Sequence, residues 1–354
     1  MNPYINLPKN SFWKQGVVEA PFFEMDSIYT KKFVIDPHAK FATAGSCFAQ
    51  HISKNLALNG YSVIDQEPAP LWLPREVHSN FGYSLFSARY GNIYTVASLL
   101  QLAKELNGLE PENIVWQKDG RYYDALRPSV EPSGFNSAQE CRTHRRFHLH
   151  KVKELFRKMD IFIFTLGLTE AWIHNDSKTV FPTAPGVIAG TMDEQFSFIN
   201  FGFQEIIEQF NSFIGILGSL RNGSLPKIIL SVSPVPLTAT ASGKHILNAN
   251  SRSKSILRAV AGQLEQDNQF IDYFPSFEII TNPSSRGNFF ENNLRSVNSL
   301  GIKTVMQAFF NQHQLINPVN EFQKITDEIK IMERANLTSQ DPTCDDAILE
   351  AFGK

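Results

Sequence analysis

Short apolar runs alternate with amphipathic stretches along most of the chain. The run 41–44 is apolar and has the length of a strand. After Gly45, apolar residues recur at every fourth position until Gly60, at Phe48, Ile52 and Leu56. This spacing is typical of a helix with one buried face. The pattern therefore predicts a strand, a tight turn and a helix that ends near Gly60.

The same alternation continues as far as residue 310. The runs 160–167 and 227–234 are almost unbroken and suit strands that are buried on both faces. Shorter strands are predicted at 61–64 and 270–274. Helices are predicted at about 94–106, 138–159, 203–217, 246–265 and 300–310. Short strands separated by helices predict an α/β fold with a central, mostly parallel sheet covered on both faces.

Three segments lie outside this alternation. Residues 1–38 mix prolines, aromatic residues and charges without a clear period, and we expect them to wrap around the main domain. The insertion at about 108–137 is rich in turn signals and should form a cap or lid. We expect residues 39–315 to form one domain and residues 316–354 to form a polar helical tail.

Composition excludes several classes of protein. The chain has 33 Lys and Arg against 35 Asp and Glu, so it lacks the broad positive field that attracts nucleic acid or anionic lipid. It contains no apolar run of membrane-spanning length and no signal-peptide pattern at the start. Its three cysteines include no CxxC pair. We expect a cytoplasmic protein without nucleic-acid partner, membrane insertion or cofactor, and the oligomeric state is not indicated.

Ser46 is the best candidate for a nucleophile. In an open parallel sheet, ligands collect at the carboxyl ends of the strands, and Gly45-Ser46-Cys47 follows the first predicted strand. The helix after Ser46 would offer N–H groups to an oxyanion. The alternative is that Ser46 is an N-cap, and Cys47 is either a reactive thiol or a small core residue. The enzymatic interpretation requires the Ser46 hydroxyl to open into a cleft flanked by donors for an oxyanion. A hydroxyl sealed beneath packed side chains, with no cavity beside it, would leave only the fold supported.

Residues 45–49 read Gly-Ser-Cys-Phe-Ala and match the signature of the GSCFA family. The chain resembles that family from about 33 to 310. Supporting stretches lie at 90–95, 164–172, 231–234, 253–254 and 273–276. The GSCFA family is similar to the SGNH hydrolases. The resemblance therefore implies a flavodoxin-like, SGNH-type three-layer sandwich with loop or cap insertions.

The same resemblance implies a function. It points to a serine esterase or O-acyltransferase, with O-acetyl as the expected group, acting on a carbohydrate, as in polysaccharide biosynthesis, or on an acylated small molecule. Ser46 would form the acyl-enzyme, next to Gly45 and Cys47. Gly167 and Thr169 would overlie the block that usually supplies an oxyanion-binding asparagine. Asn92 is an alternative amide donor, or merely stabilises a turn.

The usual Asp-x-x-His pair is missing, because Asn293 and Ser296 stand at its two positions. Without a base the hydroxyl of a serine is essentially un-ionised near neutral pH. His245 is the first candidate for a replacement base, or is an exposed loop histidine. Glu170 could orient that base or act as one, or could pair with an arginine. The alternative function is a catalytically silent carbohydrate-binding protein on the same fold.

Other signals are weaker. Ser251 and Lys254 have the SxxK spacing but no companion motif, so we interpret them as a coincidence on a helix surface. The basic stretch 142–158 is either a solvated helix face or a site for an anionic ligand. His144 and His148 are spaced for a metal but lack further ligands, so no metal is predicted. His51 should lie on a helix flank, and His78 and His174 follow loops near the expected site without a pattern that favours either.

Overall fold

The computed structural model describes residues 2–25, 27–112 and 114–314. Its centre is a five-stranded parallel sheet with the strand order β10-β9-β5-β1-β2. The strands are β1 (Lys40–Gly45), β2 (Ser62–Val63), β5 (Ile161–Leu166), β9 (Lys227–Val232) and β10 (Ile271–Tyr273). The predicted parallel sheet is therefore confirmed.

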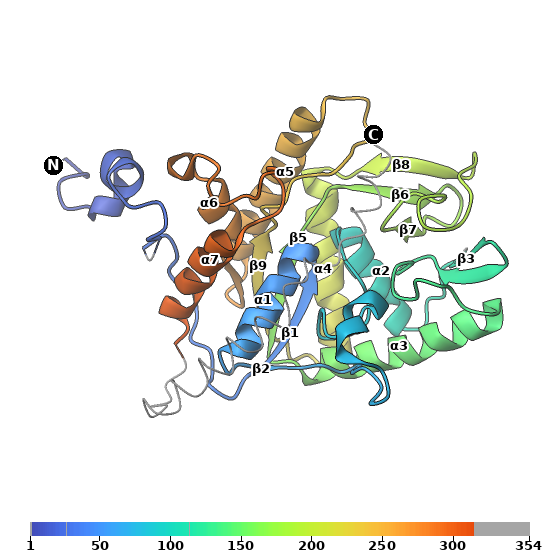
Figure 1. The fold of residues 1–354 in the computed structure, drawn as a ribbon. Coiled ribbons are helices and arrows are strands. Elements are labelled where there is room, and N and C mark those ends of the chain that lie inside the picture. Colours follow the sequence, from blue (N-terminus) through green and yellow to red (C-terminus); the bar gives the residue numbers. More distant parts are fainter. Residues whose placement is uncertain (1, 26, 113, 315–354) are drawn as a thin grey trace.

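Helices cover both faces of this sheet (Figure 1). One face packs against α1 (Cys47–Leu58), α6 (Ser276–Thr281) and α7 (Ser299–Gln312). The other packs against α2 (Val96–Leu106), α3 (Ala138–Lys158), α4 (Phe203–Leu220) and α5 (Ile246–Asp267). The result is a three-layer α/β fold of the flavodoxin-like kind. Within the described residues, no helix combines the length and apolar character needed to cross a membrane.

The strands alternate their side chains between two cores. Phe162 and Phe164 of β5 belong to the core beneath α2 to α5, whereas Ile161 and Ile163 belong to the core beneath α1 and α7. All six residues of β5 are buried. Because both faces of a central parallel strand are covered, its sequence is continuously apolar rather than alternating.

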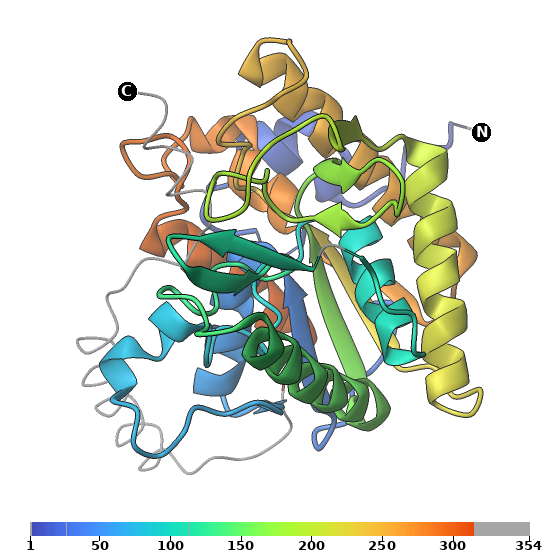
Figure 2. The same cartoon turned by 90° about the vertical axis from the view of Figure 1, so that its right-hand side faces the viewer.

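Two small antiparallel sheets lie on the side of α2, α3 and α4, which Figure 2 views from the front. Inside the predicted insertion, β3 (Val115–Lys118) and β4 (Arg121–Asp124) form a hairpin. Asp119 and Gly120 turn the chain with φ values of 50° and 75°, as a two-residue hairpin loop requires. The second sheet was not predicted, and it contains β6 (Glu170–His174), β7 (Val180–Phe181) and β8 (Phe196–Asn200).

The segment before β1 has an exposed beginning and an anchored end. Residues 2–20 stand away from the body (Figure 1) and contain no buried residue. Tyr29 is buried, and its hydroxyl lies 2.8 Å from both Asp272 and His313. The predicted tail at 316–354 lies outside the described residues. The remaining short helices are η1 (Lys9–Ser11), η2 (Lys14–Val18), η3 (Arg75–Val77), η4 (Ser79–Phe81) and η5 (Pro283–Ser285).

Candidate functional site

The turn between β1 and α1 places Ser46 at the carboxyl edge of the sheet. Gly45 has a φ of 140°, and a Cβ on it would lie 2.5 Å from the carbonyl oxygen of Thr165. Only glycine fits this backbone. Ser46 is extended, with φ −78° and ψ 179°, and its N–H donates to Thr165 O at 3.4 Å. The chain therefore turns abruptly from strand to helix at the predicted nucleophile.

The hydroxyl of Ser46 has no hydrogen-bond partner among the described residues. Ser46 occupies the N-cap position of α1 but makes no side-chain cap bond, so the capping interpretation is wrong. Ser46 is only 4% exposed and its Oγ is buried, so the expected open cleft at this atom is wrong as well. A buried, unsatisfied hydroxyl costs about 1–3 kcal/mol, and the unused cap would contribute about 1 kcal/mol. The position of this hydroxyl therefore does not stabilise the fold.

The turn after β5 packs directly against Ser46. A Cβ on Gly167 would lie 3.1 Å from the Cβ of Ser46. The N–H groups of Gly167 and Leu168 donate to the carbonyl oxygen of Tyr94, at 3.1 and 2.9 Å. From α5, Lys254 Nζ donates to Gly167 O at 2.8 Å. The loop at 90–94, the turn after β5 and helix α5 are thus joined beside the candidate nucleophile.

Thr169 and Glu170 belong to a polar cluster around Asn200. Thr169 Oγ1, the predicted oxyanion donor, donates to Asn200 Oδ1 at 2.8 Å. Glu170 Oε1 accepts from Thr240 Oγ1 at 2.9 Å and from Asn200 Nδ2 at 3.3 Å. Burial raises the pKa of the Glu170 carboxyl. Sequence reasoning missed Asn200, although it ends an alternation in which Phe196 and Phe198 point the same way.

Asn92 lies closer to the turn. The N–H of Ile93 donates to Gly45 O at 2.9 Å, which holds the loop at 90–94 against the end of β1. Gln50 of α1 donates from Nε2 to Asn92 Oδ1 at 3.3 Å. The thiol of Cys47, the first residue of α1, is buried. Of the predicted oxyanion and substrate-binding residues, the structure brings Gly45, Cys47, Asn92 and Gly167 to this turn.

Within the described part of the chain, no histidine or carboxylate forms a hydrogen bond with the Ser46 hydroxyl. His245 is exposed and caps α5, because its Nδ1 accepts the N–H of Leu247 at 3.2 Å. Asn293 and Ser296 close a local turn in an exposed loop, with Asn293 Nδ2 donating to Ser296 Oγ at 3.0 Å. The role of His245 as a base stays a prediction.

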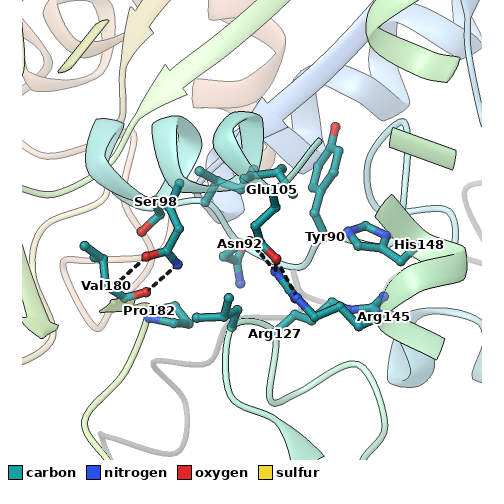
Figure 3. Close-up of a pocket in the computed structure, with 13 residues that line it drawn as sticks. Tyr90, Asn92, Ser98, Glu105, Arg127, Arg145, His148, Val180 and Pro182 are labelled. Atoms are coloured by element: carbon teal, nitrogen blue, oxygen red, sulfur yellow. Dashed lines mark hydrogen bonds and ion pairs between the residues drawn. The ribbon is translucent and has the colours of Figure 1, made fainter. Parts of the chain in front are cut away.

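A small cavity of about 30 Å³, lined by both apolar and charged side chains, lies between α2, α3 and the loop at 90–94 (Figure 3). Arg145 lies in its wall and donates to both carboxylate oxygens of Glu105, at 2.5 and 2.6 Å, and to Asp124 at 3.0 Å. The interpretation of 142–158 as a solvated face is wrong for Arg145 and His148, which are buried. Their helical spacing from the buried positions Cys141, Val152 and Leu155 was the signal that could have identified them.

His148 and Glu67 form a buried pair in the same region, with His148 Nδ1 2.7 Å from Glu67 Oε2. Burial alone would raise the pKa of Glu67, but His148, Arg127 and the N–H of Arg89 together lower it to about 2. Burial lowers the pKa of His148 to about 4. At neutral pH the neutral ring therefore donates its Nδ1–H to the Glu67 carboxylate. This bond ties the loop after β2 to α3.

Acidification should destabilise the protein through His148. Its folded-state pKa is lowered to about 4, below the value of about 6.5 for an unfolded histidine. The unfolded chain therefore binds more protons between these pH values, and the free energy of unfolding falls as the pH drops through this window. At about pH 5 the loss should be on the order of 2 kcal/mol. Urea unfolding near pH 7 and at about pH 5 measures it.

The control for this prediction is His148→Asn, whose amide keeps a donor toward Glu67 but does not titrate. The variant should lose this part of the pH dependence. If wild type and variant lose the same stability on acidification, His148 is not the titrating group.

These observations define a class of protein: a three-layer α/β protein with a serine between its first central strand and helix, and a glycine turn packed against that serine. The sequence model of the GSCFA family matches residues 40–309. The chain belongs to the GSCFA family, as residues 45–49 indicated. A search of curated proteins found no match.

Proposed function

We propose that this GSCFA protein is an SGNH-like serine esterase or O-acyltransferase that forms an acyl-enzyme on Ser46. The observation that carries the proposal is the Ser46 hydroxyl, which is held at the sheet's carboxyl edge without a hydrogen-bond partner among the described residues. A serine kept for stability would cap the helix or bond to a neighbour. A buried polar group that does neither calls for an explanation, of which a catalytic role is one, and Ser46 is the residue of this kind that stands at the strand-to-helix turn.

The surroundings of Ser46 suit acyl transfer. Attack of Oγ on an ester carbonyl carbon creates an oxyanion, which the N-terminal end of α1 would stabilise through its dipole and N–H groups. Asn92 lies at the same turn, bonded through Oδ1 to Gln50, and has an amide N–H group of the kind that binds an oxyanion. Because Oγ is buried, an ester can reach it only if a covering segment moves, as loops do in many enzymes.

A carbohydrate substrate agrees with the polar cluster at the same edge. Asn200 accepts from Arg252 and Thr169 and donates to Glu170. Amide, guanidinium and carboxylate groups together can donate to and accept from the hydroxyl groups of a sugar. The acetyl group follows from the resemblance, and hydrolysis and transfer differ only in whether water or another hydroxyl accepts it.

A second candidate is a catalytically silent carbohydrate-binding protein. The observation that favours it is the loop at 293–296, where Asn293 and Ser296 stand at the positions of the usual Asp-x-x-His pair and bond to each other. The buried Ser46 hydroxyl agrees with this candidate too.

Labelling with a fluorophosphonate probe, followed by peptide mapping, tests Ser46 directly. Wild type should gain one probe molecule on Ser46 and hydrolyse 4-nitrophenyl acetate. Ser46→Ala should take no label and lose esterase activity by about 10³-fold or more. Ser251→Ala, which removes an exposed hydroxyl from α5, is the matched control and should behave as wild type.

Label or turnover that persists in Ser46→Ala would exclude Ser46 as the nucleophile. A wild-type protein that binds glycans on an array, yet takes no label and hydrolyses no ester, would establish the silent candidate.

A further inference from the structure

Lys254 does not lie on the helix surface where its spacing from Ser251 suggested. It is only 2% exposed, and its Nζ donates to Gly167 O at 2.8 Å. Lysine is almost never fully buried unless its charge is paired, because burial disfavours the ammonium form. The interpretation of Lys254 as a surface residue is therefore wrong, and its position needs a reason.

Gly167 contacts both Lys254 and Ser46. Its carbonyl oxygen accepts the amine, and its α-carbon packs so closely on Ser46 that an added Cβ would lie 3.1 Å from the Ser46 Cβ. A second bond fixes α5 to the same turn, since Thr169 N–H donates to Ser253 Oγ at 3.1 Å. A buried amine and an unpaired hydroxyl are thus brought to one turn by residues far apart in the sequence.

We propose that Lys254 is the general base of Ser46 and takes the place of the missing histidine. This inference rests on the proposed acyl-transfer function. Pairs of serine and lysine perform acyl transfer on unrelated folds, and a buried lysine can serve as a base because burial favours its neutral amine.

Three nearby titratable groups bond to partners other than Ser46. Glu170 accepts from Thr240 and Asn200, and Arg252 donates to Asn200. His245 accepts the N–H of Leu247 at the start of α5. Lys254, in contrast, donates to Gly167, the residue that packs on Ser46.

The proton balance closes with these two residues. The neutral amine leaves Gly167 O and accepts the Ser46 Oγ–H proton as Oγ bonds to the ester carbonyl carbon, whose π electrons move to oxygen. When the oxyanion collapses, the bond to the alcohol oxygen breaks and the ammonium protonates that oxygen. Water or an acceptor hydroxyl then loses its proton to the amine and attacks the acyl carbon. Ser46 Oγ leaves with the proton from Lys254.

Chemical rescue by a small amine tests this role. The rate of fluorophosphonate labelling at Ser46 should fall about 10²–10⁴-fold in Lys254→Ala. Added n-propylamine should restore part of that rate in Lys254→Ala and none in Ser46→Ala. Lys303→Met, which removes an exposed amine from α7, should label at the wild-type rate.

Lys254→Arg separates loss of the base from loss of the fold, because arginine keeps a donor for Gly167 O but cannot give up its proton. It should fold, with a wild-type circular dichroism spectrum, and label as slowly as Lys254→Ala without amine. Wild-type labelling in either variant would overturn the proposal and leave Ser46 as the nucleophile. Slow labelling that no amine restores would also overturn the proposal, and would mean that Lys254 only holds the turn in place. If wild type itself takes no label, the proposed function fails rather than the base alone.

Discussion

Replacing Gly45 by alanine should lower the free energy of unfolding by about 2–6 kcal/mol. A side chain at φ 140° is strained, and its Cβ would lie 2.5 Å from Thr165 O. Backbone strain of this kind costs about 1–3 kcal/mol, and forcing extra atoms into a packed interior costs a further 1–3 kcal/mol or so. Because β1 and β5 are adjacent strands, the clash cannot be relieved without parting the centre of the sheet. Urea unfolding followed by circular dichroism measures the loss.

Gly243→Ala is the matched control for strain without a clash. Gly243 also has a positive φ, 71°, but a Cβ there would meet nothing within 4 Å. Its replacement should cost about 1 kcal/mol. If the two variants are equally stable, the close approach of β1 and β5 at this turn is wrong. The comparison bears on function as well, because the same turn positions Ser46.

Replacing Arg145 by methionine should destabilise the protein by about 3–5 kcal/mol. Arg145 pairs with Glu105 and Asp124, and all three side chains are at least 95% buried. Removing Arg145 would leave the buried Glu105 carboxylate without its cation. Asp124, in contrast, would keep its ion pair with Arg127 at 2.7 Å. Burial raises the pKa of Glu105 even with Arg145 present, so its carboxylate depends on the guanidinium. Thermal and urea unfolding measure the effect.

Arg146→Met is the control on the same helix. Arg146 is exposed and, within the part of the chain that the structure describes, bonds only to Thr143, at 3.4 Å, so its loss should change stability by less than about 0.5 kcal/mol. A second substitution, Glu105→Leu, should restore part of the stability of Arg145→Met, because it removes one unpaired carboxylate. If Arg145→Met proves as stable as Arg146→Met, the buried network does not hold α3 to α2.

The two largest expected losses of stability come from residues close to the candidate site. Gly45 shapes the turn that carries Ser46, and the Arg145 network lies behind the loop at 90–94, which contains Asn92. The stability of variants at Gly45 and Arg145 should therefore be measured before their activity is interpreted. Losses at Ser46 and Lys254, by contrast, should appear in labelling rates while the fold persists.

Local pattern was enough to predict the central architecture. The apolar runs at 41–44, 160–167 and 227–234 became β1, β5 and β9, because the periodicity of a sequence reports directly which faces of an element are buried. The same level of information located the turn at Ser46, since a short family signature coincides with the end of a strand.

The second small sheet could not be predicted from the local pattern of apolar residues. Strand β7 has only two residues, and the alternation of Phe196 and Phe198 in β8 is too short to predict a strand by itself, since all five residues of β8 are only half-buried. Their pairing with β6 depends on contacts across the intervening loops. Such strands form because a neighbouring strand pairs with them, and not because their own residues strongly favour the β conformation.

The sequence by itself determined the layered α/β fold, the strand-to-helix turn and Ser46 as the residue to test. Only the tertiary structure decided the state of the site. It left the Ser46 hydroxyl uncapped, paired His148 with Glu67 81 positions away, and brought Lys254 to Gly167, 87 positions away. Spacing along a chain tells which residues share one face of a helix. It does not tell what that face meets, because the partner comes from a different element and is selected by the packing of the whole sheet.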